Sequence, residues 1–144
     1  MYIAEIRIRN YRCFPNMVIE FQPGLNVIIG ENNAGKTALL KALGFIFDHS
    51  RRSRPDIHDF HQGITDYSLP PDIEISVVLR SSKRDTLDDK AVVATWLTKL
   101  ESPWEARLTY HFFLPEEHNE EFKKAVGTSP DGERFLNTVE TLLP

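Results

Sequence analysis

Alternation of apolar and polar residues predicts several strands along the chain. The alternation runs first through Ala4–Ile8 and then through Met17–Phe21, and the dipeptide Pro23-Gly24 follows as a turn. It returns at 73–80 and at 106–114. This periodicity is typical of a strand with one buried and one exposed face. We therefore expect an antiparallel pair near the N-terminus and two more half-buried strands later in the chain.

A short apolar run, Leu25–Ile29, directly precedes a glycine-containing stretch and a helical pattern. The run predicts a buried strand. Apolar residues then recur at the spacing of one helix face, at Leu39, Ala42, Leu43, Ile46 and Phe47. This order of elements predicts an α/β fold in which an antiparallel pair is attached to a parallel core.

The second half of the chain carries further helical patterns. Apolar residues from Leu87 to Leu100 predict a helix that buries Trp96. A second helix is expected over Glu116–Val126, and a last one begins near Asp131, which is suited to cap it. The polar stretch from Asp48 to Gly63 is expected to form a loop.

Size and composition narrow the class of protein. The chain has 144 residues and a formal net charge of −4, and Cys13 is its single cysteine. This length suits one domain, and the net charge gives no general attraction to nucleic acid. A lone cysteine excludes an internal disulfide, and no apolar run reaches membrane-spanning length. We expect a cytoplasmic protein without a membrane partner.

The main chemical motif is GENNAGKT, from Gly30 to Thr37, which matches the phosphate-binding loop G-x-x-x-x-G-K-[ST]. Gly30 and Gly35 allow the backbone to turn tightly and to approach a ligand closely. Lys36 supplies a positive charge for the β and γ phosphate oxygens. The Thr37 hydroxyl is the expected ligand for Mg²⁺. The motif therefore predicts binding of a nucleoside triphosphate.

Main-chain amides of this loop are expected to converge on one phosphate. They do so at the first turn of a helix, where unpaired N–H groups and the helix dipole favour an anion. The predicted binding residues are Gly30, Asn32, Asn33, Ala34, Gly35, Lys36, Thr37 and Ala38.

The segment between the first two strands, Asn10–Phe14, has the sequence NYRCF. By itself it predicts a turn with Tyr11 and Phe14 buried. Together with PGLNVIIGENNAGKT it resembles the N-[FY]-R-x-F opening and the phosphate loop of the RecF and SMC class of ABC-type ATPases. Asn33 stands where that class most often has glycine. The resemblance implies that the segment lies beside the nucleotide, with Arg12 as a further contact.

Within this class, MYIAEIRIRNYRCF and GENNAGKTALLKALGFIF, followed by an Asp-Phe pair, are most similar to the OLD (overcoming lysogenization defect) family. The resemblance implies the N-terminal lobe of a P-loop NTPase of ABC/RecF/SMC type, with antiparallel strands beside the phosphate-binding strand and helix. It implies ATP and Mg²⁺ as cofactors, and a homodimer or higher oligomer. It also implies that the full-length protein acts on DNA, as an ATP-dependent endonuclease with a C-terminal Toprim domain.

The motifs that hydrolysis requires are absent from the sequence. No later apolar run ends in Asp as a Walker B strand does, and no L-S-G-G signature is present. We therefore expect residues 1–144 to be the N-terminal part of an ABC-type ATPase domain, without catalytic residues and inactive alone. We further expect an unpaired sheet edge, through which the chain self-associates or which a C-terminal helix covers.

Other interpretations of the motif stay open. A stand-alone GTPase or kinase would need a guanine-reading N-K-x-D or an arginine-rich lid, and neither is present. A binding module that holds nucleotide without hydrolysing it needs neither.

The polar loop also carries candidate ligands. Arg51, Arg52 and Arg54 could contact nucleotide or a DNA backbone, or could simply be solvated. The loop further contains Asp56, His58, Asp59 and His61, and their loose spacing makes a metal site the weaker hypothesis.

Overall fold

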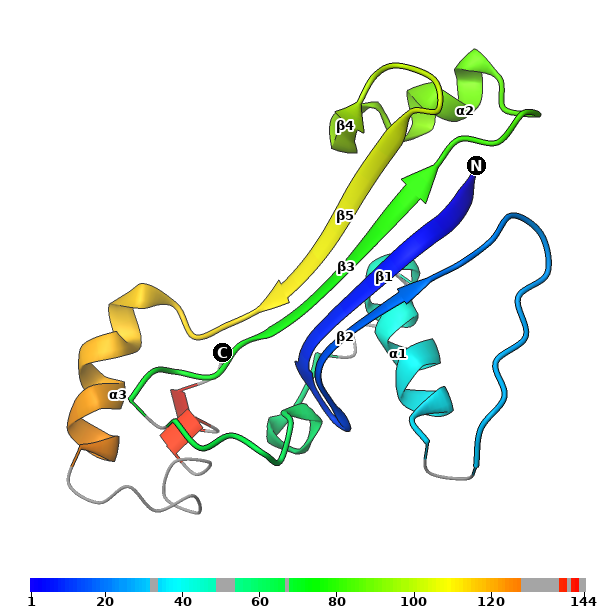
Figure 1. Cartoon of the computed structure of the whole chain (residues 1–144). Coiled ribbons are helices and arrows are strands. Elements are labelled where there is room, and N and C mark those ends of the chain that lie inside the picture. Colours follow the sequence, from blue (N-terminus) through cyan, green and yellow to red (C-terminus); the bar gives the residue numbers. More distant parts are fainter. Residues whose placement is uncertain (32–33, 49–53, 67, 128–137, 140, 143–144) are drawn as a thin grey trace.

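The computed structural model describes residues 1–31, 34–48, 54–66, 68–127, 138–139 and 141–142. Its centre is a five-stranded sheet with the strand order β2-β1-β3-β5-β4, in which every neighbouring pair is antiparallel. Figure 1 shows the long strands side by side, with α2 and β4 at one end of the sheet and α3 beyond the other.

The strands are β1 (Tyr2–Tyr11), β2 (Phe14–Glu20), β3 (Ile73–Arg80), β4 (Leu97–Lys99) and β5 (Glu105–Phe112). The helices are α1 (Lys36–Phe47), α2 (Leu87–Val92) and α3 (Asn119–Val126). Single 3-10 turns occur at η1 (Ile57–Asp59), η2 (Ala94–Trp96) and η3 (Glu116–His118). The four strands predicted from alternation are confirmed as β1, β2, β3 and β5. The helix predicted over Glu116–Val126 is confirmed from Asn119 onwards, after the turn η3. The predicted last helix lies mostly outside the described residues.

The centre of the core is formed by β1 and β3. Their inward side chains are fully buried, and the register places Ile8 opposite Ile75 and Ile6 opposite Val77. Ser76 and Val78, on the other face of β3, are buried as well. The prediction of a half-buried strand was therefore wrong for β3, because pairing with both β1 and β5 leaves little of it exposed.

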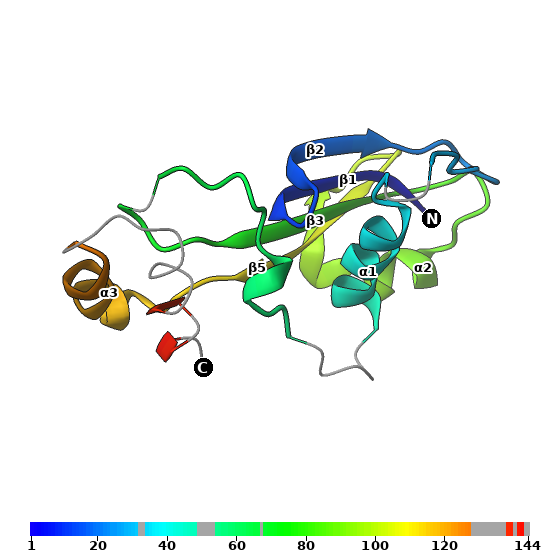
Figure 2. The ribbon, with the colours of Figure 1, turned by 90° about the horizontal axis from the view of Figure 1, so that it is seen from below.

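Helix α1 covers one face of the sheet (Figure 2). It buries Leu39, Ala42 and Ile46, as its spacing predicted, and leaves Phe47 partly exposed. The ring of Phe45 stacks on Tyr110 at 5.1 Å between centroids and meets Tyr11 edge-on at 5.9 Å. These contacts fix the helix that follows the phosphate loop against the strands.

The predicted strand at Leu25–Ile29 is not formed. The expected parallel core is therefore also wrong for the described strands, all of which pair antiparallel. The turn before Leu25 is present, and Asn26 closes it by donating to the Gln22 carbonyl at 2.8 Å. Leu25, Val27 and Ile29 are then 91%, 71% and 90% exposed. An apolar run becomes a strand only beside another strand, and none of the described strands pairs with this segment.

The helix predicted from Leu87 to Leu100 is also corrected. Helix α2 ends at Val92, η2 follows, and β4 pairs with β5. Trp96, expected in the core, is 48% exposed, whereas Val93 is buried. The periodicity indicated the first turns correctly, but strand pairing decides the conformation beyond them.

Among the described residues, no helix combines the length and the apolar character needed to cross a membrane.

We expect the exposed segment to promote self-association of this chain, because its apolar side chains and main-chain groups lack a partner strand. Replacing Val27 and Ile29 together with serine should shift the chain towards monomer in sedimentation velocity. The free energy of unfolding should change by less than about 0.5 kcal/mol, as for other exposed positions.

Leu87→Ser is the matched control, since Leu87 is 85% exposed and belongs to α2, outside this segment. It should leave the association unchanged. A wild-type chain that remains monomeric over a wide concentration range would contradict the prediction.

Candidate nucleotide-binding site

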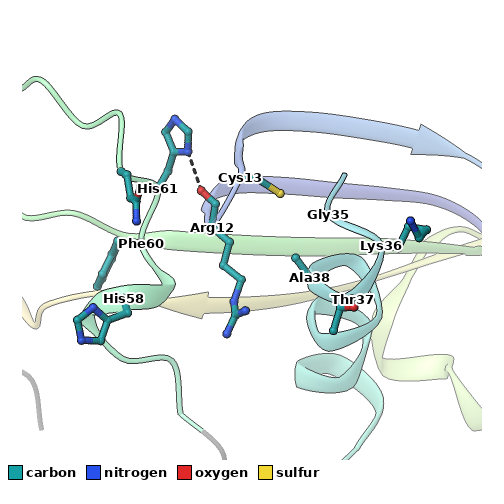
Figure 3. Close-up of a pocket in the computed structure, with 10 residues that line it drawn as sticks. Arg12, Cys13, Gly35, Lys36, Thr37, Ala38, His58, Phe60 and His61 are labelled. Carbon is teal, nitrogen blue, oxygen red and sulfur yellow. Dashed lines mark hydrogen bonds between the residues drawn. The ribbon is translucent and has the colours of Figure 1, made fainter. Parts of the chain in front are cut away.

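A pocket of about 710 Å³ opens between the β1–β2 hairpin, the start of α1 and the turn η1 (Figure 3). Its volume suits a small-molecule ligand. It is lined by Arg12, Cys13, Gly35, Lys36, Thr37, Ala38, His58, Phe60, His61 and Gln62. The pocket thus brings Arg12 to the second half of the predicted phosphate loop.

Gly35 directly precedes the first residue of α1. It has φ +86° and serves as the N-cap of the helix, where no side chain caps the first turn. A Cβ atom on Gly35 would lie 2.5 Å from Phe14 Cζ and 2.7 Å from Cys13 Sγ. The hairpin tip therefore packs directly on the glycine, and the helix N-terminus is left to receive an acceptor from elsewhere.

Lys36 folds back over the loop that precedes it. Its ammonium donates hydrogen bonds to the main-chain carbonyls of Gly30 and Glu31. The Ala34 amide also donates to the Glu31 carbonyl, at 3.2 Å. These contacts keep the positive charge at the loop, and a bound phosphate would exchange the carbonyl acceptors for its own oxygens.

Not all predicted loop residues line the pocket. Gly30 and Ala34 are described but do not line it, and Asn32 and Asn33 lie outside the described residues. A Cβ on Gly30 would come within 3.1 Å of the Ala34 Cβ, so this glycine permits a close approach within the loop. The pocket itself is bounded by the part of the motif that opens α1.

Arg12 lies at the tip of the hairpin with φ +50°, a left-handed conformation. Its Nε donates to Asp59 Oδ1 at 2.7 Å, and its Cζ lies 5.6 Å from the centroid of the Tyr11 ring. Burial by itself would lower the pKa of Arg12, but the hydrogen bond to Asp59 helps to raise it above its ordinary value. Arg12 is therefore a permanent positive charge at the pocket.

The turn η1 holds the hairpin tip by main-chain contacts. The Arg12 amide donates to the Asp59 carbonyl at 2.7 Å, and the His61 amide donates to the Asn10 carbonyl at 3.2 Å. Phe60 forms an isolated antiparallel bridge with Tyr11. The Arg12 carbonyl is 2.7 Å from His61 Nδ1, the contact dashed in Figure 3. Two segments far apart in the sequence thus form one wall.

A second pocket, of about 380 Å³, adjoins the first and shares Arg12 and Thr37 with it. Tyr11, Lys41 and Asp59 also line it. The Tyr11 hydroxyl is buried with no hydrogen-bond partner among the described residues, and burial raises the pKa of Tyr11. The binding region therefore extends along the side of α1 beyond Arg12.

Thr37 is the residue that the sequence predicts as a ligand of Mg²⁺. It is exposed in the first turn of α1, and it lines the pocket together with Lys36. Mg²⁺ needs few protein ligands, because phosphate oxygens and water complete its shell. The Thr37 hydroxyl fits that role, although none of the described residues that line this pocket carries a carboxylate.

Among the described residues of the polar loop, the acidic and histidine side chains do not form a metal cluster. Asp56 accepts from the His58 amide at 2.8 Å as a cap of η1, and Asp59 pairs with Arg12.

Among the described residues, one group has metal-ligand spacing: Asp72, Glu74 and His111. Arg9 already contacts its carboxylates, at 2.7 Å for Asp72 and 3.0 Å for Glu74.

Several pocket residues were not predicted from the sequence. Cys13 was predicted to lie beside the nucleotide only as part of the segment Asn10–Phe14, and Asp59 was considered as a possible metal ligand and as part of the Asp-Phe pair. The pocket residues that no prediction placed in the binding site are His58, Phe60, His61 and Gln62. Of the loop arginines, Arg54 is described and does not line the pocket, while Arg51 and Arg52 lie outside the described residues. The sequence feature that could have indicated this side of the pocket is the Asp-Phe pair, which is Asp59 and Phe60.

Comparison with known proteins identifies the family of this chain. The model of the family described as AAA ATPase domain matches residues 1–134. The DNA replication and repair protein RecF of Limosilactobacillus fermentum is 29% identical over 129 residues, which cover 81% of this chain and 32% of that protein. RecF of Streptococcus uberis is 46% identical over 57 residues, or 39% of this chain and 16% of that protein. The chain spans about a third or less of these curated relatives.

A solved structure is also similar in part. It is described as "Structural biochemistry of ATP-driven dimerization and DNA stimulated activation of SMC ATPases", and the alignment covers 92% of this chain and 83% of that one. The sequence identity is 15% and the TM-score is 0.48. The family match confirms the predicted fold class, an α/β P-loop NTPase lobe.

Gly35→Ala should destabilise the protein, because the new methyl group would overlap Phe14 and Cys13 and the backbone is left-handed there. We expect the free energy of unfolding to fall by about 2 kcal/mol or more. Urea denaturation followed by circular dichroism measures the change.

Gly44→Ala is the matched control on the same helix, since a Cβ there meets nothing within 4 Å. It should stabilise the protein by about 0.5–1 kcal/mol, as expected for glycine in a helix interior. Equal effects of the two substitutions would contradict the packing described at Gly35.

Proposed function

Since the chain belongs to the AAA ATPase domain family, we propose that it binds ATP through the loop at the start of α1. The observation that carries this proposal is the joining of Lys36, Thr37 and Arg12 around one pocket at an uncapped helix N-terminus. Such an N-terminus favours phosphate through its free amides and the helix dipole.

The phosphates would lie at the first turn of α1. Lys36 would turn from the Gly30 and Glu31 carbonyls to the β and γ phosphate oxygens. Arg12, across the pocket from the helix, would add a second positive charge. The amides of the predicted loop residues, from Asn32 to Ala38, would supply the remaining donors.

Mg²⁺ would accompany the nucleotide and neutralise part of its phosphate charge. Among the pocket residues, Thr37 would hold it with its hydroxyl oxygen. Hydrolysis also requires a carboxylate that orients the attacking water, and the described residues that line the pocket with Lys36 and Thr37 include none. We therefore propose that residues 1–144 bind ATP without hydrolysing it, as the N-terminal part of an ABC-type ATPase domain.

At the level of the whole protein, we propose an ATPase that acts on DNA and pairs its ATPase domains when ATP is bound. The RecF relatives, named for DNA replication and repair, support this direction. An ATP-dependent endonuclease of the OLD type is the narrower form of the proposal, and it rests on the similarity of the N-terminal sequence and motif.

Lys36→Ala should weaken binding of MgATP by about 10- to 100-fold, the value of a charged hydrogen bond lost from a phosphate. Isothermal titration calorimetry measures the affinity. Lys123→Ala, an exposed lysine on α3 paired only loosely with Glu120 at 3.3 Å, is the control and should leave the affinity unchanged.

The same titration separates the alternatives. Thr37→Ala should reduce the dependence of ATP binding on Mg²⁺ while leaving metal-free binding nearly unchanged. Tight selectivity for GTP over ATP would instead favour a stand-alone GTPase. Full affinity in the Lys36→Ala variant would overturn the proposed function.

A further inference from the structure

We propose that Asp59 is a positioning residue for nucleotide binding, which holds the Arg12 guanidinium towards the phosphates. The inference rests on the proposed function, because it concerns how Arg12 serves the same pocket. Figure 3 shows the Arg12 side chain extending between His58 and Thr37, from the hairpin towards α1.

Asp59 contacts both ends of Arg12. Its main-chain carbonyl accepts from the Arg12 amide at 2.7 Å. Its carboxylate oxygen Oδ1 accepts from the Arg12 Nε at 2.7 Å and lies at the same distance from the terminal nitrogen Nη2. A long, flexible side chain is thereby fixed at its root and at its tip, which lowers the entropy that it would lose on binding a ligand.

The two charges differ in exposure. The Asp59 side chain is 10% exposed, whereas that of Arg12 is 37% exposed and lines both pockets. The guanidinium is therefore the more accessible partner, and of the two residues only Arg12 lines the pocket that contains Lys36 and Thr37, whereas Asp59 lines the second pocket alone. A guanidinium has five N–H donors, and a single carboxylate oxygen leaves several of them for phosphate oxygens.

Asp59 is itself held in place by η1. Its second oxygen, Oδ2, accepts from the Asp56 amide at 3.2 Å, as part of a reciprocal cap of this turn. The adjoining Phe60 and His61 contact Tyr11 and the Arg12 carbonyl. The pair is thus anchored from several sides, as a precise contact to a ligand requires.

The competing explanation is purely structural: the pair could fasten η1 to the hairpin without any role for the nucleotide. The two explanations differ in whether the effect of Asp59 depends on Arg12. A positioning residue acts through its partner, so removing both should cost no more affinity than removing Arg12 alone.

The test is a double-mutant cycle on MgATP affinity, measured by calorimetry on the same chain. We expect Asp59→Asn to weaken binding about tenfold, and Arg12→Ala by at least as much. In the Arg12→Ala background, Asp59→Asn should weaken binding by less than about twofold. Asparagine retains an oxygen for the Asp56 amide, so the turn keeps its cap.

Two outcomes overturn the proposal. Unchanged or tighter binding by Asp59→Asn means that the carboxylate does not help Arg12, or that it competes with phosphate for it. An equal loss in both backgrounds means a structural role. Glu105→Gln is the matched control, because Glu105 accepts from Arg80 at 2.8 Å far from the pocket, and it should leave the affinity unchanged.

If Asp59→Asn does not fold, Asp59→Glu replaces it in the cycle, since its longer side chain keeps the charge and displaces the guanidinium. Its loss of affinity should likewise depend on Arg12. Lys36→Ala, measured in parallel, separates this inference from the proposed function. Loss of binding in that variant, with no effect at Asp59, overturns the inference alone.

Discussion

The close packing of the hairpin tip against Gly35 is the constraint on which the site depends. The first turn of α1 leaves no room for a side chain at this glycine, because Cys13 and Phe14 already occupy the space. The same contact places Arg12, the neighbour of Cys13, beside Lys36 and Thr37. Gly35, whose left-handed backbone favours glycine, therefore also determines how closely the hairpin tip approaches the start of α1.

A second contact completes the wall of the pocket. The turn η1 attaches to the hairpin through the bridge between Phe60 and Tyr11 and through the pairing of Asp59 with Arg12. The hairpin is thus held from both sides, by the phosphate loop and by η1. Backbone conformations with positive φ at Asn10 and Arg12 persist because these contacts determine them together.

The strands show which structural features the alternation of apolar and polar residues can predict. The alternation of apolar and polar residues predicted β1, β2, β3 and β5 correctly, because successive side chains of a strand point to opposite faces of the sheet. It misjudged β3, whose second face is also buried, and it predicted a strand at Leu25–Ile29 that lacks a partner among the described strands. It also extended a helix through β4. Each of these errors concerns the tertiary neighbours of a segment, which the local sequence pattern does not specify.

The sequence by itself determined the phosphate loop, the helix that follows it and the family resemblance, because these depend on residues adjacent in the chain. It predicted Lys36 and Thr37 by type and spacing. Only the tertiary structure decided the partner of Arg12, the packing of Cys13 and Phe14 on Gly35, and the place of His58 and His61 in the pocket. These contacts join segments more than twenty residues apart, and a distance of that kind is set by the sheet register and not by local propensity.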